Sequence, residues 1–128
     1  MTITRLDHYN IRAPRAVIDR VVDFYGALLK LSPGQRPDFG IDGVWLYDRD
    51  YPIVHLTVDE TAVAPIENNH LNHIAFRCVG MKTYLDRLDA LGVDYTAAYI
   101  AELDMTQVFL YDPAGIQVEL DFPNEKAG

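Results

Sequence analysis

The sequence of 128 residues has little cysteine and no long apolar run. Cys78 is the only cysteine, so an intramolecular disulfide is excluded. No stretch approaches the roughly 18 consecutive apolar residues of a membrane-spanning helix. The opening residues, MTITRLDHYN, lack the apolar run of roughly 7–15 residues that a secretory signal carries. We therefore expect a soluble protein of the reducing cytoplasm.

Positive charge is also scarce, because 11 Lys and Arg residues stand against 19 Asp and Glu residues, a formal net charge of −8. This balance argues against nucleic acid and against an anionic membrane surface as partners. A small-molecule substrate remains open, including an anionic one held by local arginines. Apolar residues make up 49% of the chain and charged residues 23%, which is typical of one globular domain.

An internal repeat organises the chain. Residues 44–57, VWLYDRDYPIVHLT, align without gaps on residues 108–121, VFLYDPAGIQVELD, at an offset of 64. Residues 6–13, LDHYNIRA, align on residues 71–78, LNHIAFRC, at an offset of 65. The chain is therefore predicted to be one domain, 1–128, made of two similar modules, about 1–62 and 68–123, with a linker over 61–69.

Each half carries the same order of periodic segments, which predicts one strand, one helix and three strands. For the first half the predicted elements are a strand over 6–13, a helix with Pro14 in its first turn and apolar residues from Val17 to Leu29, stopped by Ser32-Pro33-Gly34, a short strand over 38–41, and a hairpin of 44–47 with 53–58. For the second half they are a strand over 71–78, a helix over 81–91 capped by Gly92, a strand over 95–100, and a hairpin of 108–111 with 116–122. The fold class is α+β, with two repeated βαβββ modules forming a curved mixed sheet.

Strand alternation places four potential metal ligands at repeat-equivalent positions. His8 and His73 occupy the same place in the two first strands, and His55 and Glu119 occupy the same place in the two last strands. All four are expected on the face turned away from the helices. Nitrogen and carboxylate groups from four strands can converge on a divalent metal ion between the halves. The alternative for each histidine is a hydrogen-bonded side chain without a metal.

Several segments resemble the vicinal oxygen chelate superfamily, which comprises glyoxalases, bleomycin-resistance proteins, fosfomycin-resistance enzymes, methylmalonyl-CoA epimerases and extradiol dioxygenases. These segments are LDHYNI, DFYGALLKL, VHLT, LNHIAF and YDPAGIQVELDF. The resemblance covers nearly the whole chain and implies paired βαβββ modules around a divalent metal ion. It implies His8, His55, His73 and Glu119 as the ligands, with Ni, Zn, Mn or Fe as the metal.

The resemblance implies a glyoxalase-like lyase or isomerase, in which the metal stabilises an enediolate or enolate of a substrate with adjacent oxygens. Glyoxalase I enzymes have an I-E-L-T segment where this chain has Val54-His55-Leu56-Thr57. A histidine there cannot serve as a carboxylate base, so Glu119 is the predicted catalytic residue. Methylmalonyl-CoA epimerases carry an amide at this position and need room for coenzyme A.

Three other functions remain open. An extradiol dioxygenase would use His8, His73 and Glu119 on Fe(II), but such enzymes have a catalytic tyrosine where this chain has Phe109. A fosfomycin-resistance enzyme would need an arginine for the phosphonate, and none follows Glu119. A bleomycin-resistance type of protein would bind its ligand without a metal.

The predicted substrate-binding residues are Asn10, Arg12, Arg77, Trp45 and Phe109. The two arginines lie on the predicted ligand face and could clamp a carboxylate, or they could pair with acidic groups. The two rings could stack on a ligand or belong to the core. Since each half-sheet leaves edges without a partner, we also expect a homodimer, with the metal site either within one chain or shared.

Overall fold

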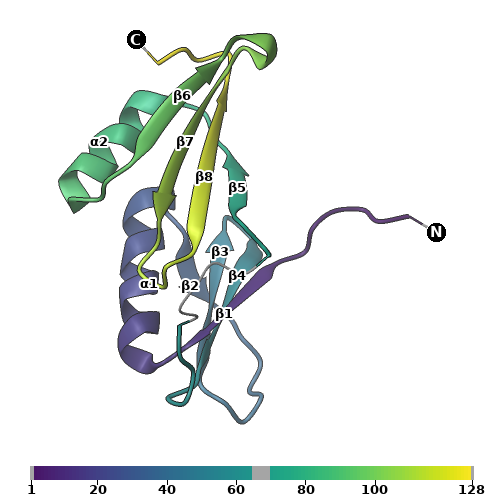
Figure 1. Ribbon diagram of the computed structural model, residues 1–128. Coiled ribbons are helices and arrows are strands. Elements are labelled where there is room, and N and C mark those ends of the chain that lie inside the picture. Colours follow the sequence, from purple (N-terminus) through teal and green to yellow (C-terminus); the bar gives the residue numbers. More distant parts are fainter. Residues whose placement is uncertain (1, 65–69, 128) are drawn as a thin grey trace. The chain divides into compact units, whose positions relative to one another are not determined.

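The computed structural model describes residues 2–64 and 70–127 (Figure 1). The chain divides into two compact units, Met1–Ala64 and Pro65–Gly128, called module one and module two below. Part of the predicted linker, residues 65–69, lies outside the described residues. In the described part of the chain, no helix is both long enough and apolar enough to span a membrane.

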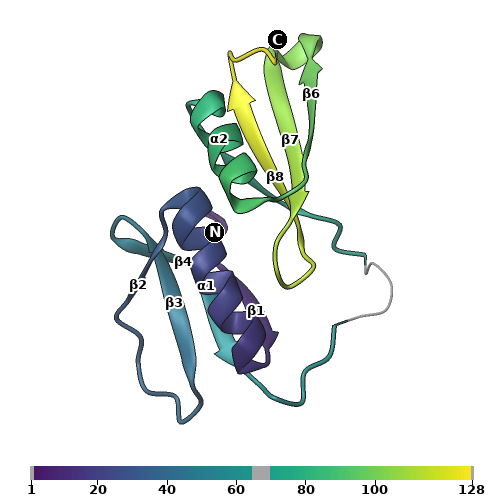
Figure 2. The ribbon, with the colours of Figure 1, turned by 90° about the vertical axis from the view of Figure 1, so that its left-hand side faces the viewer.

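Module one is a four-stranded mixed sheet with one helix on one face (Figure 2). Its elements are β1 (Tyr9–Ala13), α1 (Arg15–Leu29), β2 (Ser32–Gly34), β3 (Gly43–Asp48) and β4 (Tyr51–Val58). The strand order is β1-β4-β3-β2, with β1 parallel to β4 and the other neighbours antiparallel.

Module two repeats this arrangement. Its elements are β5 (Ile74–Arg77), α2 (Met81–Leu91), β6 (Thr96–Ile100), a 3₁₀ turn η1 (Ala101–Leu103), β7 (Met105–Tyr111) and β8 (Gln117–Pro123). The strand order is β5-β8-β7-β6, and β5 is parallel to β8. The predicted α+β fold of two βαβββ modules is confirmed.

Each module buries its own apolar core between helix and sheet, which accounts for the alternation read from the sequence. The fully buried residues of module one are Ile18, Val21, Tyr25, Leu28, Leu46, Val54 and Leu56. Those of module two include Leu88, Val108, Leu110, Val118, Leu120 and Phe122. Because these strand residues face the helix, the residues between them in the sequence face the opposite side of each sheet.

A glutamate from the end of each module caps the helix of the same module. Pro14 and Gly80 precede the two helices and carry no side-chain acceptor for the free N–H groups of the first turn. The Glu125 carboxylate accepts hydrogen bonds from the backbone N–H groups of Gly80 and Met81, both at 2.9 Å. Glu60 accepts one from Arg15 N at 2.9 Å. Sequence reasoning missed both caps, since each glutamate lies more than 40 positions from the helix start.

The predicted strand over 38–41 is wrong, because the strand between the helix and the hairpin of module one is β2, Ser32–Gly34. Lys30 adopts the left-handed conformation and ends α1, and β2 begins two residues later and pairs with β3. Pro33 is tolerated because β2 is an edge strand. Gly34 is required because an added Cβ would lie 2.6 Å from Tyr47 ring atoms.

The first strand of each module is shorter than predicted. His8 and His73 therefore lie immediately before β1 and β5 rather than within them. The β1–β4 ladder begins with Tyr9 opposite Val54, and the β5–β8 ladder begins with Ile74 opposite Val118.

Candidate functional site

In module one, three aromatic side chains are stacked in a column on the face turned away from α1. Trp45 of β3 and His55 of β4 are partners in the sheet register, and their ring centroids lie 4.0 Å apart with an interplanar angle of 16°. The His8 ring lies on the other side of His55, at 3.6 Å and 11°. The module therefore brings two of the predicted ligands into direct contact.

Both histidines of this column are oriented by hydrogen bonds. His8 Nδ1 lies 2.6 Å from Asp7 Oδ1, and Tyr51 donates its hydroxyl hydrogen to the other Asp7 oxygen. The hydrogen bond with His8, followed by that with Tyr51, lowers the pKa of Asp7. His55 Nε2 lies 3.1 Å from the carbonyl oxygen of Pro52. Burial, and then the nearby His8, lowers the pKa of His55, so this imidazole favours its neutral form.

Module two brings the other two predicted ligands together. His73 Nε2 lies 3.2 Å from Glu119 Oε1, and His73 Nδ1 lies 2.8 Å from Asn72 Oδ1. Gln107 of β7 donates from its side-chain amide to Glu119 Oε2 at 3.3 Å. The Phe109 ring stands edge-on to the His73 ring, with 6.0 Å between centroids.

Glu119 is a buried carboxyl group, only 5% exposed, in the middle strand pair of module two. Burial, together with the hydrogen bond and charge of Asp121 two residues further along β8, raises the pKa of Glu119 to about 7. Asp121 Oδ1 is itself buried and has no hydrogen-bond partner among the residues that the structure describes. A carboxyl group with such a pKa can accept and release a proton near neutral pH. In its ionised form, a nearby cation would offset the free-energy cost of burying the negative charge.

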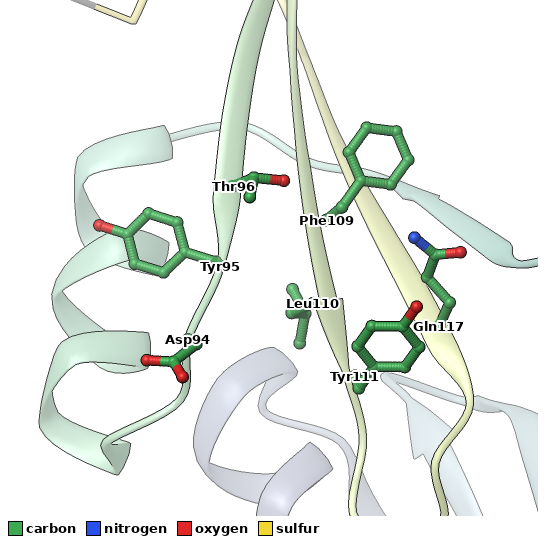
Figure 3. A pocket seen from close by; sticks show the side chains of 7 residues that line it. All are labelled: Asp94, Tyr95, Thr96, Phe109, Leu110, Tyr111 and Gln117. Atoms are coloured by element: carbon green, nitrogen blue, oxygen red, sulfur yellow. The ribbon is translucent and has the colours of Figure 1, made fainter.

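A shallow pocket of about 230 Å³ lies at one end of the sheet of module two (Figure 3). Figure 3 shows Asp94 and Tyr95 on one side, Phe109, Tyr111 and Gln117 on the other, and Leu110 between them. Phe109 is the register partner of Glu119, so one ring borders both the pocket and the histidine–carboxylate pair. The volume is below the roughly 300–1,000 Å³ of sites for drug-sized ligands, and it suits one ring-sized group.

The structure gives several predicted substrate-binding side chains partners within their own module. Asn10 donates to Thr57 Oγ1 at 3.0 Å, and Arg12 forms an ion pair with Asp59 at 2.9 Å. The Arg12 ion pair agrees with the alternative interpretation of the sequence, in which the arginines pair with acidic groups instead of binding a substrate carboxylate. Arg77 is the register partner of Asp121 and is exposed. Trp45 belongs to the ring column, and Phe109 borders the pocket.

The four predicted ligands are thus present as one pair in each module, His8 with His55 and His73 with Glu119. Among residues 2–64 and 70–127, no group of three or more His, Cys, Asp or Glu side chains is gathered at one point. The four-ligand site remains a prediction. Sequence reasoning did not assign a role to Asp7, Asn72 or Asp121, although the first two occupy equivalent places before the paired histidines.

Comparisons with known proteins agree with this fold. A curated relative, glyoxylase I 4 of Arabidopsis thaliana, is 29% identical over 124 residues, which span 92% of this chain and 70% of the relative. The structure of a glyoxylase/bleomycin resistance protein/dioxygenase domain from Frankia sp. EAN1pec superposes with a TM-score of 0.78 at 14% identity and covers 98% of this chain and 96% of that one. No family model matches the sequence.

The chain is similar in sequence and fold to proteins of the glyoxalase/bleomycin resistance/dioxygenase superfamily. A further member of this fold, a fosfomycin resistance protein from Listeria monocytogenes, has been solved as a mutant with Mn(II) and a dihydroxypropylphosphonic acid. Its TM-score is 0.71 at 15% identity, with 95% of this chain and 94% of that chain covered. By residue type, the two imidazoles of module one and the imidazole with a buried carboxylate of module two are each of the kind that binds divalent transition metal ions, so the residues fit such an ion.

Proposed function

We propose that this protein is a divalent-metal-dependent lyase or isomerase of the glyoxalase kind, acting on a small substrate with two adjacent oxygens. The observation that carries the proposal is the contact between predicted ligands in each module: His8 on His55, and His73 on Glu119. Equivalent positions of the repeat thus hold ligand-type side chains together twice. The similarity to this superfamily supports the same interpretation.

His8, His55, His73 and Glu119 would hold the metal ion. When bound, the ion supplies Lewis acidity that stabilises negative charge on the substrate oxygens. Glu119 moves the proton: its carboxylate can take a proton from the carbon next to a carbonyl and return it to the neighbouring carbon. Gln107 holds the second oxygen of this carboxylate, so the reacting oxygen is the one beside His73.

Phe109 favours this reaction class over an extradiol dioxygenase. Its phenyl ring stands beside His73 and has no group that donates or accepts a proton. The Fe(II)-loaded protein should consume no oxygen when it is incubated with catechols in air. Oxygen uptake coupled to ring cleavage would replace the present proposal with the dioxygenase.

The test of the lyase or isomerase reaction has two parts. Elemental analysis identifies the metal ion in the purified protein, and its occupancy is measured again after mild chelation. Solvent deuterium should then exchange into α-hydroxycarbonyl compounds with the metal-loaded protein, and Glu119→Gln should abolish the exchange. Binding of metal without exchange by any substrate of this class would refute Glu119 as the base.

A second candidate function is sequestration of a flat ligand without chemistry, which the pocket of module two favours. Phe109 and Tyr111 offer two ring faces there, and Tyr111 is 54% exposed. Tight binding of aromatic compounds by the metal-free protein, together with silence in the oxygen and deuterium assays, would support this function.

We further propose that the protein is a cytoplasmic homodimer. The single thiol, Cys78, is buried and unpaired, and burial raises its pKa to about 11, so it stays a protonated thiol. Edge strands in each four-stranded sheet favour association. A mixture of His8→Ala and Glu119→Ala chains, unfolded and refolded together, regains metal binding if the site is shared between chains. If proven heterodimers do not regain metal binding, the site lies within one chain. If sedimentation shows a monomer, the dimer proposal is refuted.

A further inference from the structure

The residue before each paired histidine has the same contact in both modules. Asp7 Oδ1 lies 2.6 Å from His8 Nδ1, and Asn72 Oδ1 lies 2.8 Å from His73 Nδ1. Asp7 and Asn72 occupy equivalent positions of the repeat, at an offset of 65. The two contacts therefore arise from one local arrangement of the chain, used twice.

The hydrogen-bond chemistry of these contacts determines which nitrogen carries the proton. An ionised carboxylate only accepts, and an amide oxygen only accepts, so Nδ1 of each neutral imidazole must be the donor. A neutral imidazole has one N–H, and Nε2 is then left with a free lone pair. In module two, this Nε2 lies 3.2 Å from Glu119 Oε1, a contact that fits the Nδ1–H tautomer when the Glu119 carboxyl group is protonated and donates to Nε2.

We propose that Asp7 and Asn72 are positioning residues that fix His8 and His73 in the Nδ1–H tautomer and so present Nε2 as the metal-ligating atom. This inference rests on the proposed metal site. Metal-binding histidines generally donate their other ring N–H to a carboxylate or carbonyl acceptor, which fixes ring orientation and raises ligand basicity. His55 is oriented differently, because its partner is the backbone carbonyl of Pro52 rather than a side chain.

The hydrogen bonds made by Asp7 and Asn72 differ in expected strength. The Asp7 carboxylate gives a charge-assisted hydrogen bond, and Tyr51 holds its second oxygen, with the Arg5 guanidinium 3.5 Å from the centroid of the Tyr51 ring. Asn72 offers a neutral acceptor only. We therefore expect His8 to be held more strongly in its tautomer than His73, and Asp7 to matter more for affinity than Asn72.

The substitutions that test this inference are at exposed positions, so the fold is expected to survive them. The Asp7 side chain is 69% exposed, and Asn72 is exposed. The informative variants are Asp7→Ala, Asn72→Ala and the conservative Asp7→Asn. Asp19→Ala on α1 is the matched control, since it removes one exposed carboxylate elsewhere in module one. Circular dichroism and the unfolding temperature verify the fold of each variant.

The first measurement needs no metal. Long-range proton–nitrogen NMR correlations of metal-free protein with ¹⁵N-labelled histidine, at a pH where the imidazoles are neutral, report the tautomer directly. The wild type and Asp19→Ala should show Nδ1–H for His8 and His73. Asp7→Ala should move His8 toward Nε2–H, Asn72→Ala should do so for His73, and Asp7→Asn should keep Nδ1–H at His8.

The second measurement is the affinity for Zn(II) or Co(II), with the absorption bands of Co(II) as a signature of the ligand set. Each alanine variant should lose about 10- to 100-fold in affinity, Asp7→Ala more than Asn72→Ala, while Asp7→Asn recovers most of the loss and Asp19→Ala loses none. Nε2–H tautomers in the wild type, or alanine variants with unchanged tautomers and affinities, would overturn the inference. If the wild type binds neither ion, the proposed function fails, and the nitrogen shifts alone then decide the tautomer assignment.

Discussion

Modules one and two share one scaffold but differ in what their equivalent side chains do. Trp45 and His55 in module one correspond to Phe109 and Glu119 in module two. In module one, Trp45, His55 and His8 form a continuous column of rings. In module two, a buried carboxylate replaces the central ring, and Phe109 stands edge-on to His73 instead of stacking.

Equivalent positions of the two modules also differ in charge and in the pKa of their side chains. Thr57 and Asp121 are also equivalent, and in module one the hydroxyl is neutral and bonded to Asn10. In module two the corresponding carboxylate lies beside Glu119 and raises its pKa. Module one thus carries two stacked imidazoles, of which His55 has a lowered pKa, while module two carries a buried carboxyl group whose pKa is raised to about 7.

The largest expected effect concerns the pH dependence of metal binding. Protons compete with a metal ion for its ligands, so affinity falls as the pH falls. Because the pKa of Glu119 is about 7, about half of the group is already protonated at pH 7, and this group alone should weaken binding about 50-fold between pH 7 and pH 5. Competition titrations with a metal indicator measure the slope. The slope in Glu119→Gln should be shallower by one proton, and an equal slope would assign the effect to the histidines alone.

The second prediction uses Glu119→Gln to separate function from stability. The variant should lose at least about tenfold in metal affinity. Its metal-free form should nevertheless be more stable than the wild type at pH 8, by on the order of 2–3 kcal/mol, since a buried carboxylate is replaced by a neutral amide. The raised pKa makes folding disfavour the charged form, so this gain is absent below about pH 4.5, the ordinary pKa of the group, and is complete above about pH 7.

Thermal unfolding of metal-free protein at several pH values measures this gain. His55→Gln is the matched variant in module one and should also weaken metal binding. It should bring no comparable stabilisation at pH 8, since the imidazole is neutral there. A Glu119→Gln protein with the same unfolding temperature as the wild type at pH 8 would show that the carboxylate carries no burial cost.

The third prediction concerns the two equivalent aromatic residues. Trp45→Ala removes the outer ring of the column and should destabilise the protein by about 2 kcal/mol, of which ring stacking contributes about 0.5–1.5 kcal/mol. Phe109→Ala should cost less, because this ring contacts His73 edge-on instead of lying in a stacked column, and it borders an open pocket. Denaturant unfolding measures both changes. Equal losses would mean that the column adds nothing beyond the burial of each ring.

The smallest effects are expected at the two helix caps. Glu125→Ala leaves two backbone N–H groups without a partner and should cost about 1 kcal/mol. Glu60→Ala removes one exposed hydrogen bond and should cost only a few tenths of a kcal/mol. Denaturant unfolding of the two variants and of Glu102→Ala, an exposed glutamate in η1, measures the difference. A larger loss for Glu60→Ala would reverse this ranking.

Much of the fold could be predicted from the sequence, because the repeat and the apolar alternation are local signals. The helices, the hairpins and the face that carries His55 and Glu119 follow from periodicities of 3.6 and 2 residues. The strand over 38–41 was wrong for a tertiary reason. The sequence pattern assigned Pro33 and Gly34 to the end of the helix, but both belong to an edge strand. The edge tolerates the missing N–H of Pro33, and the missing Cβ of Gly34 leaves room for the Tyr47 ring.

The sequence by itself determined the two modules and the equivalent places of the four ligand-type residues. A repeat preserves both the order of the elements and the face of the sheet on which each strand residue lies. Only the tertiary structure decided how these residues meet. Parallel pairing of β1 with β4 and of β5 with β8 brings residues more than 40 positions apart into one sheet. Stacking of His8 on His55, and the burial and neighbouring charge that raise the pKa of Glu119, depend on those contacts, because desolvation and Coulomb interactions act through space rather than along the chain.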